Sequence, residues 1–203
     1  MGKKGETTLL KEGLAAMRSV GTVHPSSVFL ARALMPAIAK SDPPRVIIEL
    51  GAGTGIVTEE IAKHIRPHDL LVGIEANKKL ADICEKNIEK HARKGNVFCV
   101  HAKAQDTGDI LRAHGAVSAD AVVCTLPFRL LPRNDTKEIL KEVRHIIKPG
   151  GQFIFIRYII APANKEVAEA LPDFSVLKKR LVLRNIPPAE VIVMRKKMSS
   201  DGR

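Results

Sequence analysis

This chain of 203 residues is poor in the residue types that several kinds of site require. It has no tryptophan, one tyrosine and only 3% aromatic residues, which argues against a pocket that stacks flipped nucleic-acid bases. The three cysteines, Cys84, Cys99 and Cys124, lack metal-ligand spacing, so we expect reduced thiols, no metal site and a cytoplasmic location. No apolar run approaches the roughly 18 residues of a membrane span, and we expect no signal peptide.

The composition instead fits one folded domain with a basic surface. Hydrophobic residues make up 45% of the chain, which is enough to bury a core. Lysine and arginine number 33 against 22 acidic residues, a net charge of +11. This excess favours an anionic partner, which could be a nucleic acid, a membrane surface or an acidic small molecule.

Alternating strand and helix patterns predict an α/β fold. We expect an N-terminal helical extension over residues 1–40, followed by a single domain over 41–203. Strands are expected at 45–50, 70–75, 96–100, 119–124 and 151–157, and helices at 54–65, 77–92, 106–113, 134–147 and 163–171. A turn at 148–151 should feed the fifth strand. The runs 175–184 and 191–196 have no helix between them, so they should pair antiparallel on a mostly parallel sheet with helices on both faces.

The most informative segment is residues 46–55, where an apolar run meets Glu49 and then Gly51, Gly53 and Gly55 at alternate positions. Glycines here let the backbone approach a ligand closely. The order differs from the dinucleotide fingerprint G-x-G-x-x-G. It resembles motif I of the class I S-adenosylmethionine (SAM) methyltransferases, which implies a seven-stranded Rossmann-like sheet and SAM as the cofactor. A mononucleotide or NAD site in another doubly wound fold is the alternative.

The resemblance implies a set of cofactor contacts at three strand ends. Glu75 ends the second strand and would accept both ribose hydroxyls, although an acid favoured by the helix dipole would look the same. The third strand departs from the family, because Lys103 stands where an aspartate usually holds adenine, and lysine has no acceptor. Asp106 or the Ala104 backbone would have to serve instead. The expected cofactor-binding residues are Glu49, Gly51, Ala52, Gly53, Gly55, Glu75, Ala76, Ala104 and Ser27.

The fourth strand ends at Thr125-Leu126-Pro127-Phe128, the place where amine-directed methyltransferases meet the acceptor nitrogen. Adenine N6 methyltransferases carry Asn or Asp where Thr125 stands. Pro127 holds Leu126 extended and fixes the direction of its carbonyl. Phe128 would contact the substrate or simply pack in the core.

A closer resemblance, over roughly residues 20–197, is to the bacterial phospholipid N-methyltransferase family. It rests on these segments: His24-Pro25-Ser26-Ser27, Leu126 to Pro132, Pro149 to Phe153, Arg157-Tyr158 and Asn185 to Val191. The family methylates the amine head group of phosphatidylethanolamine, and some relatives methylate ornithine lipids. The resemblance therefore implies an aminophospholipid substrate and a peripheral position on the inner face of an anionic membrane.

The same resemblance assigns roles at the acceptor site. Thr125, the Leu126 carbonyl and Tyr158 would orient the amine, with Phe128 and Tyr158 available for cation–π contact. Tyr158 would otherwise be an ordinary sheet-edge residue. Ser27 and His24 precede a helix expected to cover the cofactor, or they cap that helix. The residues expected to bind the lipid phosphate are Arg129, Arg133 and Arg157.

Three questions stay open at this level. An rRNA adenine N6-methyltransferase shares the fold and would explain the charge, although Thr125 and the few aromatic residues argue against it. A non-catalytic methyltransferase-like binding protein is a third class, suggested by Lys103. Residues 3–18 form a basic, amphipathic segment that would lie on a bilayer or pack on the core. The oligomeric state is not predicted.

Overall fold

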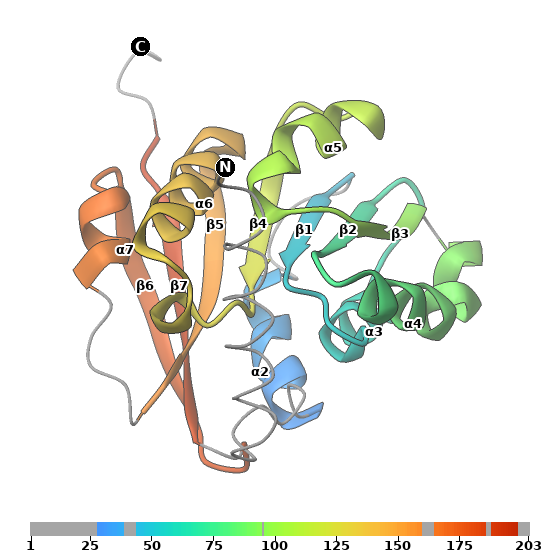
Figure 1. Cartoon of the computed structure of the whole chain (residues 1–203), viewed down its shortest axis with the longest axis horizontal. Helices are drawn as coiled ribbons and strands as arrows, with labels where there is room; N and C mark the ends of the chain where they lie inside the picture. Colours follow the sequence, from blue (N-terminus) through green and yellow to red (C-terminus); the bar gives the residue numbers. More distant parts are fainter. Residues whose placement is uncertain (1–27, 39–43, 95, 160–164, 186–187, 199–203) are drawn as a thin grey trace, which may run out of the picture.

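The computed structural model describes residues 28–38, 44–94, 96–159, 165–185 and 188–198. Seven strands form one sheet in the order β3-β2-β1-β4-β5-β7-β6, and among these described strands β7 alone runs opposite to the other six (Figure 1). This confirms the predicted fold class, including the antiparallel hairpin. The strands are β1 (Val46–Leu50), β2 (Leu70–Glu75), β3 (Asn96–His101), β4 (Ala119–Cys124), β5 (Ile147–Tyr158), β6 (Phe174–Val182) and β7 (Ala189–Lys196).

Helices cover both faces of this sheet, because neighbouring strand residues point to opposite sides. On β1, Ile47 joins the cluster of α2, α3 and α4, whereas Ile48 joins the cluster of α5, α6 and α7. The helices are α2 (Val28–Ile38), α3 (Ile56–Ala62), α4 (Lys78–Ile88), α5 (Thr107–Ala113), α6 (Arg133–Ile146) and α7 (Lys165–Ala170), with short 3₁₀ turns η1 (Glu89–Lys94), η2 (Ala104–Asp106) and η3 (Phe128–Leu130). Helix α2 packs on α3 and on β5, β6 and β7.

The fifth strand begins earlier than the sequence predicts. Residue Ile147 already pairs with Ala119, and the register then shifts so that Gln152 pairs with Ala121. Gly150 has φ +79°, and a Cβ on Gly151 would lie 2.8 Å from Ile147 Cγ2. The expectation of a separate turn at 148–151 is therefore wrong, because the glycines let these residues form an irregularity inside β5.

A buried ion pair joins the amino-terminal ends of β1 and β2. Asp69 accepts hydrogen bonds from the Arg45 backbone at 2.7 Å, from Arg45 Nη2 at 2.5 Å and from the Arg66 backbone at 2.8 Å. Burial raises the pKa of Asp69, but these donors outweigh it and the net pKa is lowered. The pair therefore stabilises the amino-terminal end of the sheet. The glycine loop lies at the opposite end, where the strands have their carboxyl ends.

Candidate active site

The glycine loop lies where the strand order reverses. Strand β1 has β2 on one side and β4 on the other, so the connections leaving these strands diverge to opposite sides. Ligands of doubly wound sheets bind at this point, outside the carboxyl ends of the strands. The backbone N–H groups of Gly51 and Ala52 both donate to the Ile74 carbonyl, at 2.9 and 3.1 Å, which holds the loop after β1 against the end of β2.

The three glycines of this loop have different roles. All have positive φ, at +84° for Gly51, +58° for Gly53 and +89° for Gly55, a region that disfavours other residues. A Cβ on Gly51 would lie 2.7 Å from Leu126 Cδ2, and one on Gly55 would lie 2.9 Å from Cys84 Sγ. A Cβ on Gly53 would meet nothing within 4 Å. Gly51 and Gly55 therefore permit close packing, and Gly53 leaves space for a ligand.

Glu75 is held at the rim of this loop by the backbone. One carboxylate oxygen accepts from the Gly53 N–H at 2.8 Å, and the other accepts from the Asn77 N–H at 2.8 Å. Each oxygen keeps a further lone pair, so the carboxylate can still accept two ligand hydroxyls. The adjacent Ala76 is exposed, and its carbonyl lies 3.2 Å from His101 Nε2. The positions of Glu75 and Ala76 suit their predicted roles.

Glu49 lies beneath the loop and is fully buried. Thr58 Oγ1 donates to Oε2 of Glu49 at 2.6 Å, while Oε1 has no partner among the described residues. Burial raises the pKa of Glu49 to about 7, against the lowering effect of the Thr58 hydrogen bond, and the nearby Glu75 raises it further. An incompletely paired acid at this place favours a cationic ligand. Sequence reasoning missed Thr58, although its place in the first helix after the glycines was a usable signal.

The third strand end carries the residues expected near adenine. The Ala102 N–H donates to the Glu75 carbonyl at 3.1 Å, so this segment lies beside the end of β2. Lys103 is exposed, Ala104 is half-buried at the start of η2, and Asp106 ends η2. The structure thus brings Ala104 near Glu75 in the fold, and which group holds adenine stays a prediction.

The fourth strand end is joined directly to the glycine loop. The Thr125 backbone donates to the Leu50 carbonyl at 3.0 Å, and its hydroxyl donates to the Gly51 carbonyl at 2.6 Å. Leu126 packs against Gly51 from the same strand end. The residues expected at the cofactor and those expected at the acceptor are therefore physically coupled through Gly51.

Two of the predicted acceptor groups have partners inside the protein. The Leu126 carbonyl accepts the Phe128 N–H at 3.0 Å, which leaves one lone pair of that oxygen. The Phe128 side chain is only 4% exposed and lies edge-on to Phe155, with 6.5 Å between ring centroids. Phe128 thus packs in the core at the base of the strand end, and substrate contact by its ring stays a prediction.

The end of β5 brings Arg157 and Tyr158 to the same edge of the sheet. Arg157 Nη2 forms an ion pair with Glu190 Oε2 at 2.7 Å, while its buried Nε has no partner among the described residues. Tyr158 is half-buried against the α2–α3–α4 cluster, and burial raises its pKa. Arg157 therefore has one buried N–H without a partner among the described residues, while 26% of its side chain stays exposed.

The other two predicted phosphate residues lie on α6 and η3. Arg133 begins α6, and its side chain is 86% exposed at 3.5 Å from Glu166. Arg129 lies in η3, but its side chain is outside the described part of the structure. Ser27 and His24 lie outside the described residues, as does the amphipathic segment 3–18.

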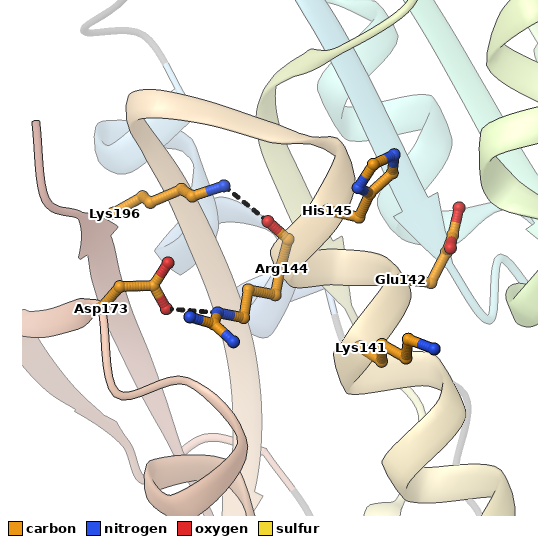
Figure 2. Close-up of a pocket in the computed structure, with 6 residues that line it drawn as sticks. All are labelled: Lys141, Glu142, Arg144, His145, Asp173 and Lys196. Carbon is orange, nitrogen blue, oxygen red and sulfur yellow. Dashed lines mark hydrogen bonds and ion pairs between the residues drawn. The ribbon is translucent and has the colours of Figure 1, made fainter. Parts of the chain in front are cut away.

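A separate cavity of about 590 Å³ lies at the opposite end of the sheet (Figure 2). Three of its lining residues are bonded within the protein: Lys196 Nζ donates to the Arg144 and Ile147 carbonyls at 2.6 and 2.8 Å, and Arg144 Nε donates to Asp173 at 2.8 Å. The Lys196 contacts satisfy carbonyl groups at the C-terminal end of α6. The lining residues are Lys141, Glu142, Arg144, His145, Asp173 and Lys196.

Comparison with known proteins identifies the chemistry of the glycine loop. Residues 47–151, which contain motif I and the ends of β2 and β4, match the family model described as a methyltransferase domain. The chain belongs to the class I SAM-dependent methyltransferases. SAM is therefore the cofactor, and the open space at Gly53, the two oxygens of Glu75 and the incompletely paired acid Glu49 fit it. None of the helices in the described residues has the length and apolarity to cross a bilayer.

Relatives of this methyltransferase act on varied acceptors. An ornithine lipid N-methyltransferase from Singulisphaera acidiphila is 30% identical over 66% of this chain and 68% of that enzyme. The ubiquinone/menaquinone biosynthesis C-methyltransferase UbiE of Wigglesworthia glossinidia brevipalpis is 25% identical over 58% of this chain, which spans only 44% of that protein. The structure of 1,6-didemethyltoxoflavin-N1-methyltransferase from Burkholderia thailandensis, with bound S-adenosylhomocysteine, aligns with a TM-score of 0.69 and 12% identity over 94% of this chain and 88% of that one.

Proposed function

We propose that this methyltransferase transfers the methyl group of SAM to the amine of a lipid head group, either a phosphatidylethanolamine-like phospholipid or a related aminolipid. The observation that supports this most is the 30% identity to an ornithine lipid N-methyltransferase across 68% of that enzyme. The two other relatives described above have different acceptors, so the head-group chemistry rests on this similarity and on the acceptor strand of this chain.

The residues at the end of β4 suit an amine acceptor. SAM, when bound, supplies a methyl group on a cationic sulfur, which is already activated for displacement. The protein must then hold a neutral amine in line with that methyl, and good alignment can contribute about 7–11 kcal/mol. The Thr125 hydroxyl donates its proton to the Gly51 carbonyl, so its oxygen can accept a hydrogen from the amine. The remaining lone pair of the Leu126 carbonyl and the Tyr158 hydroxyl are the other acceptors that we propose.

Deprotonation of the lipid ammonium is the other requirement. A buried amine beside a cationic ligand loses its proton more readily, because both burial and like charge disfavour the ammonium form. In the described structure Arg157 lies on β5 at this edge of the sheet, where its charge is paired with Glu190. The exposed part of its guanidinium would bind the head-group phosphate of a phospholipid, which is a role that we assign to Arg157 ahead of the more exposed Arg133.

The test separates the acceptor classes directly. The full chain is incubated with methyl-labelled SAM and either total lipid or total RNA, and the labelled product is identified by chromatography. We expect label in an aminolipid. Label in adenine of RNA would instead support the N6-methyltransferase alternative, which would also account for the net charge of +11. Absence of SAM binding in a calorimetric titration would indicate a non-catalytic binding protein.

Matched variants of Thr125 sharpen this test. Thr125→Ser keeps the hydroxyl that bonds to the Gly51 carbonyl, and Thr125→Val keeps the shape without it. We expect lipid methylation by the serine variant and a loss of roughly tenfold in kcat for the valine variant, since one net hydrogen bond is worth about 0.5–1.5 kcal/mol. Equal activity of the two variants would exclude a role for the hydroxyl.

A further inference from the structure

The outer strand of the sheet carries an unusual surface that the cofactor and acceptor residues do not use. We propose that this surface docks the protein on an anionic lipid bilayer. We call it the β6 surface, and it consists of Val176, Leu177, Lys178, Lys179, Arg180, Leu181, Leu183 and Arg184. The proposal deepens the proposed function and rests on it for the choice of partner, since a bilayer is where an aminolipid substrate would be found.

Exposed apolar side chains are concentrated on the β6 surface. Eleven large hydrophobic side chains are exposed in the described part of the chain, and four of them fall within residues 176–183. Their exposed fractions are 52% for Val176, 47% for Leu177, 53% for Leu181 and 68% for Leu183. Single exposed apolar residues are normal, but a group of them marks an interaction site.

The charges on the same segment are all of one sign. Residues 174–189 contain four basic residues and no acidic residue. The pairing with β7 places Lys178 and Arg180 opposite Val193 and Val191, which point toward α2, whereas Lys179 lies opposite Ile192 on the other face. Cations therefore flank the outer edge of β6 on both faces. This suits an edge-on approach to a negatively charged surface, with leucines entering the interface region.

The β6 surface reaches the edge of the sheet that holds the active site. Strands β5 and β6 run in the same direction, since β7 is antiparallel to both, so β6 ends at the carboxyl edge (Figure 1). Leu181 pairs with Glu190, which pairs with Arg157 on β5. In the turn that follows, the Arg184 guanidinium lies 5.2 Å from the ring centroid of Phe29, which is itself 45% exposed. A bilayer contacted here would lie beside the candidate phosphate residue.

Edge protection and self-association would each account for only part of this surface. Lysine on an edge strand commonly prevents edge-to-edge aggregation, but that purpose gives no reason for four exposed apolar side chains. A second copy of the chain could pair along β6, but an antiparallel pair would bring the basic clusters of both copies together, and like charges directly opposite are destabilising. An anionic bilayer satisfies the cations and covers the apolar side chains at once.

The test uses the full chain and vesicles of equal parts phosphatidylcholine and phosphatidylglycerol, with pure phosphatidylcholine vesicles for comparison. The variant combines Lys178→Gln, Lys179→Gln and Arg180→Gln, and the matched control combines Lys86→Gln, Lys137→Gln and Lys141→Gln, which remove the same charge from exposed positions on α4 and α6. Each cation near an anionic bilayer is worth about fivefold in binding, so we expect the β6 variant to bind roughly 100-fold more weakly in co-sedimentation. The control should change little.

A second variant, Leu181→Ser with Leu183→Ser, tests the apolar part, and we expect weaker vesicle binding with an unchanged melting temperature. Equal losses in the β6 variant and the control would overturn the proposal, because net charge alone would then explain binding. If the β6 variant has a smaller sedimenting mass than the wild type in the absence of vesicles, the surface binds a second copy of the chain and the proposal is overturned. If the β6 variant loses RNA binding but keeps vesicle binding, the proposal is overturned in favour of RNA.

Methylation of detergent-dispersed lipid, measured in parallel, separates this proposal from the proposed function. Vesicle binding that depends on β6, in a protein that methylates no lipid, would support docking and overturn the lipid acceptor. Lipid methylation in detergent by a protein that does not bind vesicles would support the lipid acceptor and overturn docking.

Discussion

The two halves of the sheet are built in contrasting ways. All six residues of β2 and all six of β4 are buried, and the loops after β1, β2 and β4 are bonded to one another. In the other half, seven of the nine residues of β6 are exposed. Burial on both faces therefore fixes the strands of the cofactor half, whereas the outer strand β6 leaves side chains available to a partner.

The largest effect is expected from a methyl group added inside the cofactor half. In Gly55→Ala the new Cβ would lie 2.9 Å from Cys84 Sγ, so we expect a loss of about 2–5 kcal/mol in the free energy of unfolding, from backbone strain and overpacking. Gly53→Ala has open space, so it should cost only about 1 kcal/mol of strain while weakening SAM binding. Urea denaturation and calorimetry measure the two quantities. Equal destabilisation by both substitutions would contradict the division of roles among the glycines.

Glu75 provides the next test, since it links the glycine loop to the end of β2. Glu75→Gln should weaken SAM binding by roughly 10- to 150-fold, because hydrogen bonds to a charged group are worth about 1.5–3 kcal/mol. Asp106→Asn, at the end of η2, is the matched acid and should leave affinity nearly unchanged. Calorimetric titration with SAM measures the affinity of both variants. A larger loss from the Asp106 variant would move the ribose or adenine contact to the third strand end.

Burial of Glu49 predicts a pH dependence of stability in the cofactor half. Its pKa rises from 4.5 to about 7 on folding, so the folded protein holds the proton more tightly than the unfolded chain. Its contribution to stability is therefore complete below pH 4.5 and lost as the pH rises through 7. Glu49→Gln, which carries no charge, should be more stable than the wild type above about pH 7 by on the order of 2 kcal/mol and similar below about pH 4.5. Denaturation of the SAM-free protein across this range would reveal the difference, and a constant offset would refute it.

The smallest effect is expected in the outer half, where Arg157 and Arg133 can be compared. Arg157→Gln removes the half-buried donor at the end of β5 and should raise the KM for a phospholipid by about tenfold, the value of one charge-assisted hydrogen bond. Arg133→Gln removes an exposed side chain and should change KM by less than about twofold. Initial-rate kinetics with detergent-dispersed lipid would test this. An unchanged KM in the Arg157 variant would withdraw the phosphate role.

Most of the fold could be predicted from the sequence because its signals are local. The bounds of β2 and β4 match the prediction, since each is a short apolar run that ends in polar or turn residues. The predicted helix over 77–92 was partly wrong: α4 ends at Ile88 and the remainder forms the 3₁₀ turn η1. Helix ends depend on capping and packing, which a periodic pattern does not record.

Contacts between distant segments were beyond the sequence. No spacing in the sequence predicts that Thr125 bonds to the Gly51 carbonyl or that Arg157 pairs with Glu190. Each needs the strand order and register, which fix which residues face each other only after the sheet has formed. The expected cofactor residues come from a motif and stay a prediction, whereas the partners that position them follow only from the folded sheet.

The placement of β7 between β5 and β6 constrains how the protein is made. Among the described strands β6 neighbours only β7, yet β7 follows it along the chain. During synthesis, therefore, the backbone N–H and C=O groups along both edges of β6 have no strand to pair with until residues 189–196 have been made. The run Lys178-Lys179-Arg180 keeps an unpaired strand hydrated and repels other copies of it in that interval, so these basic side chains would protect the newly made chain from aggregation.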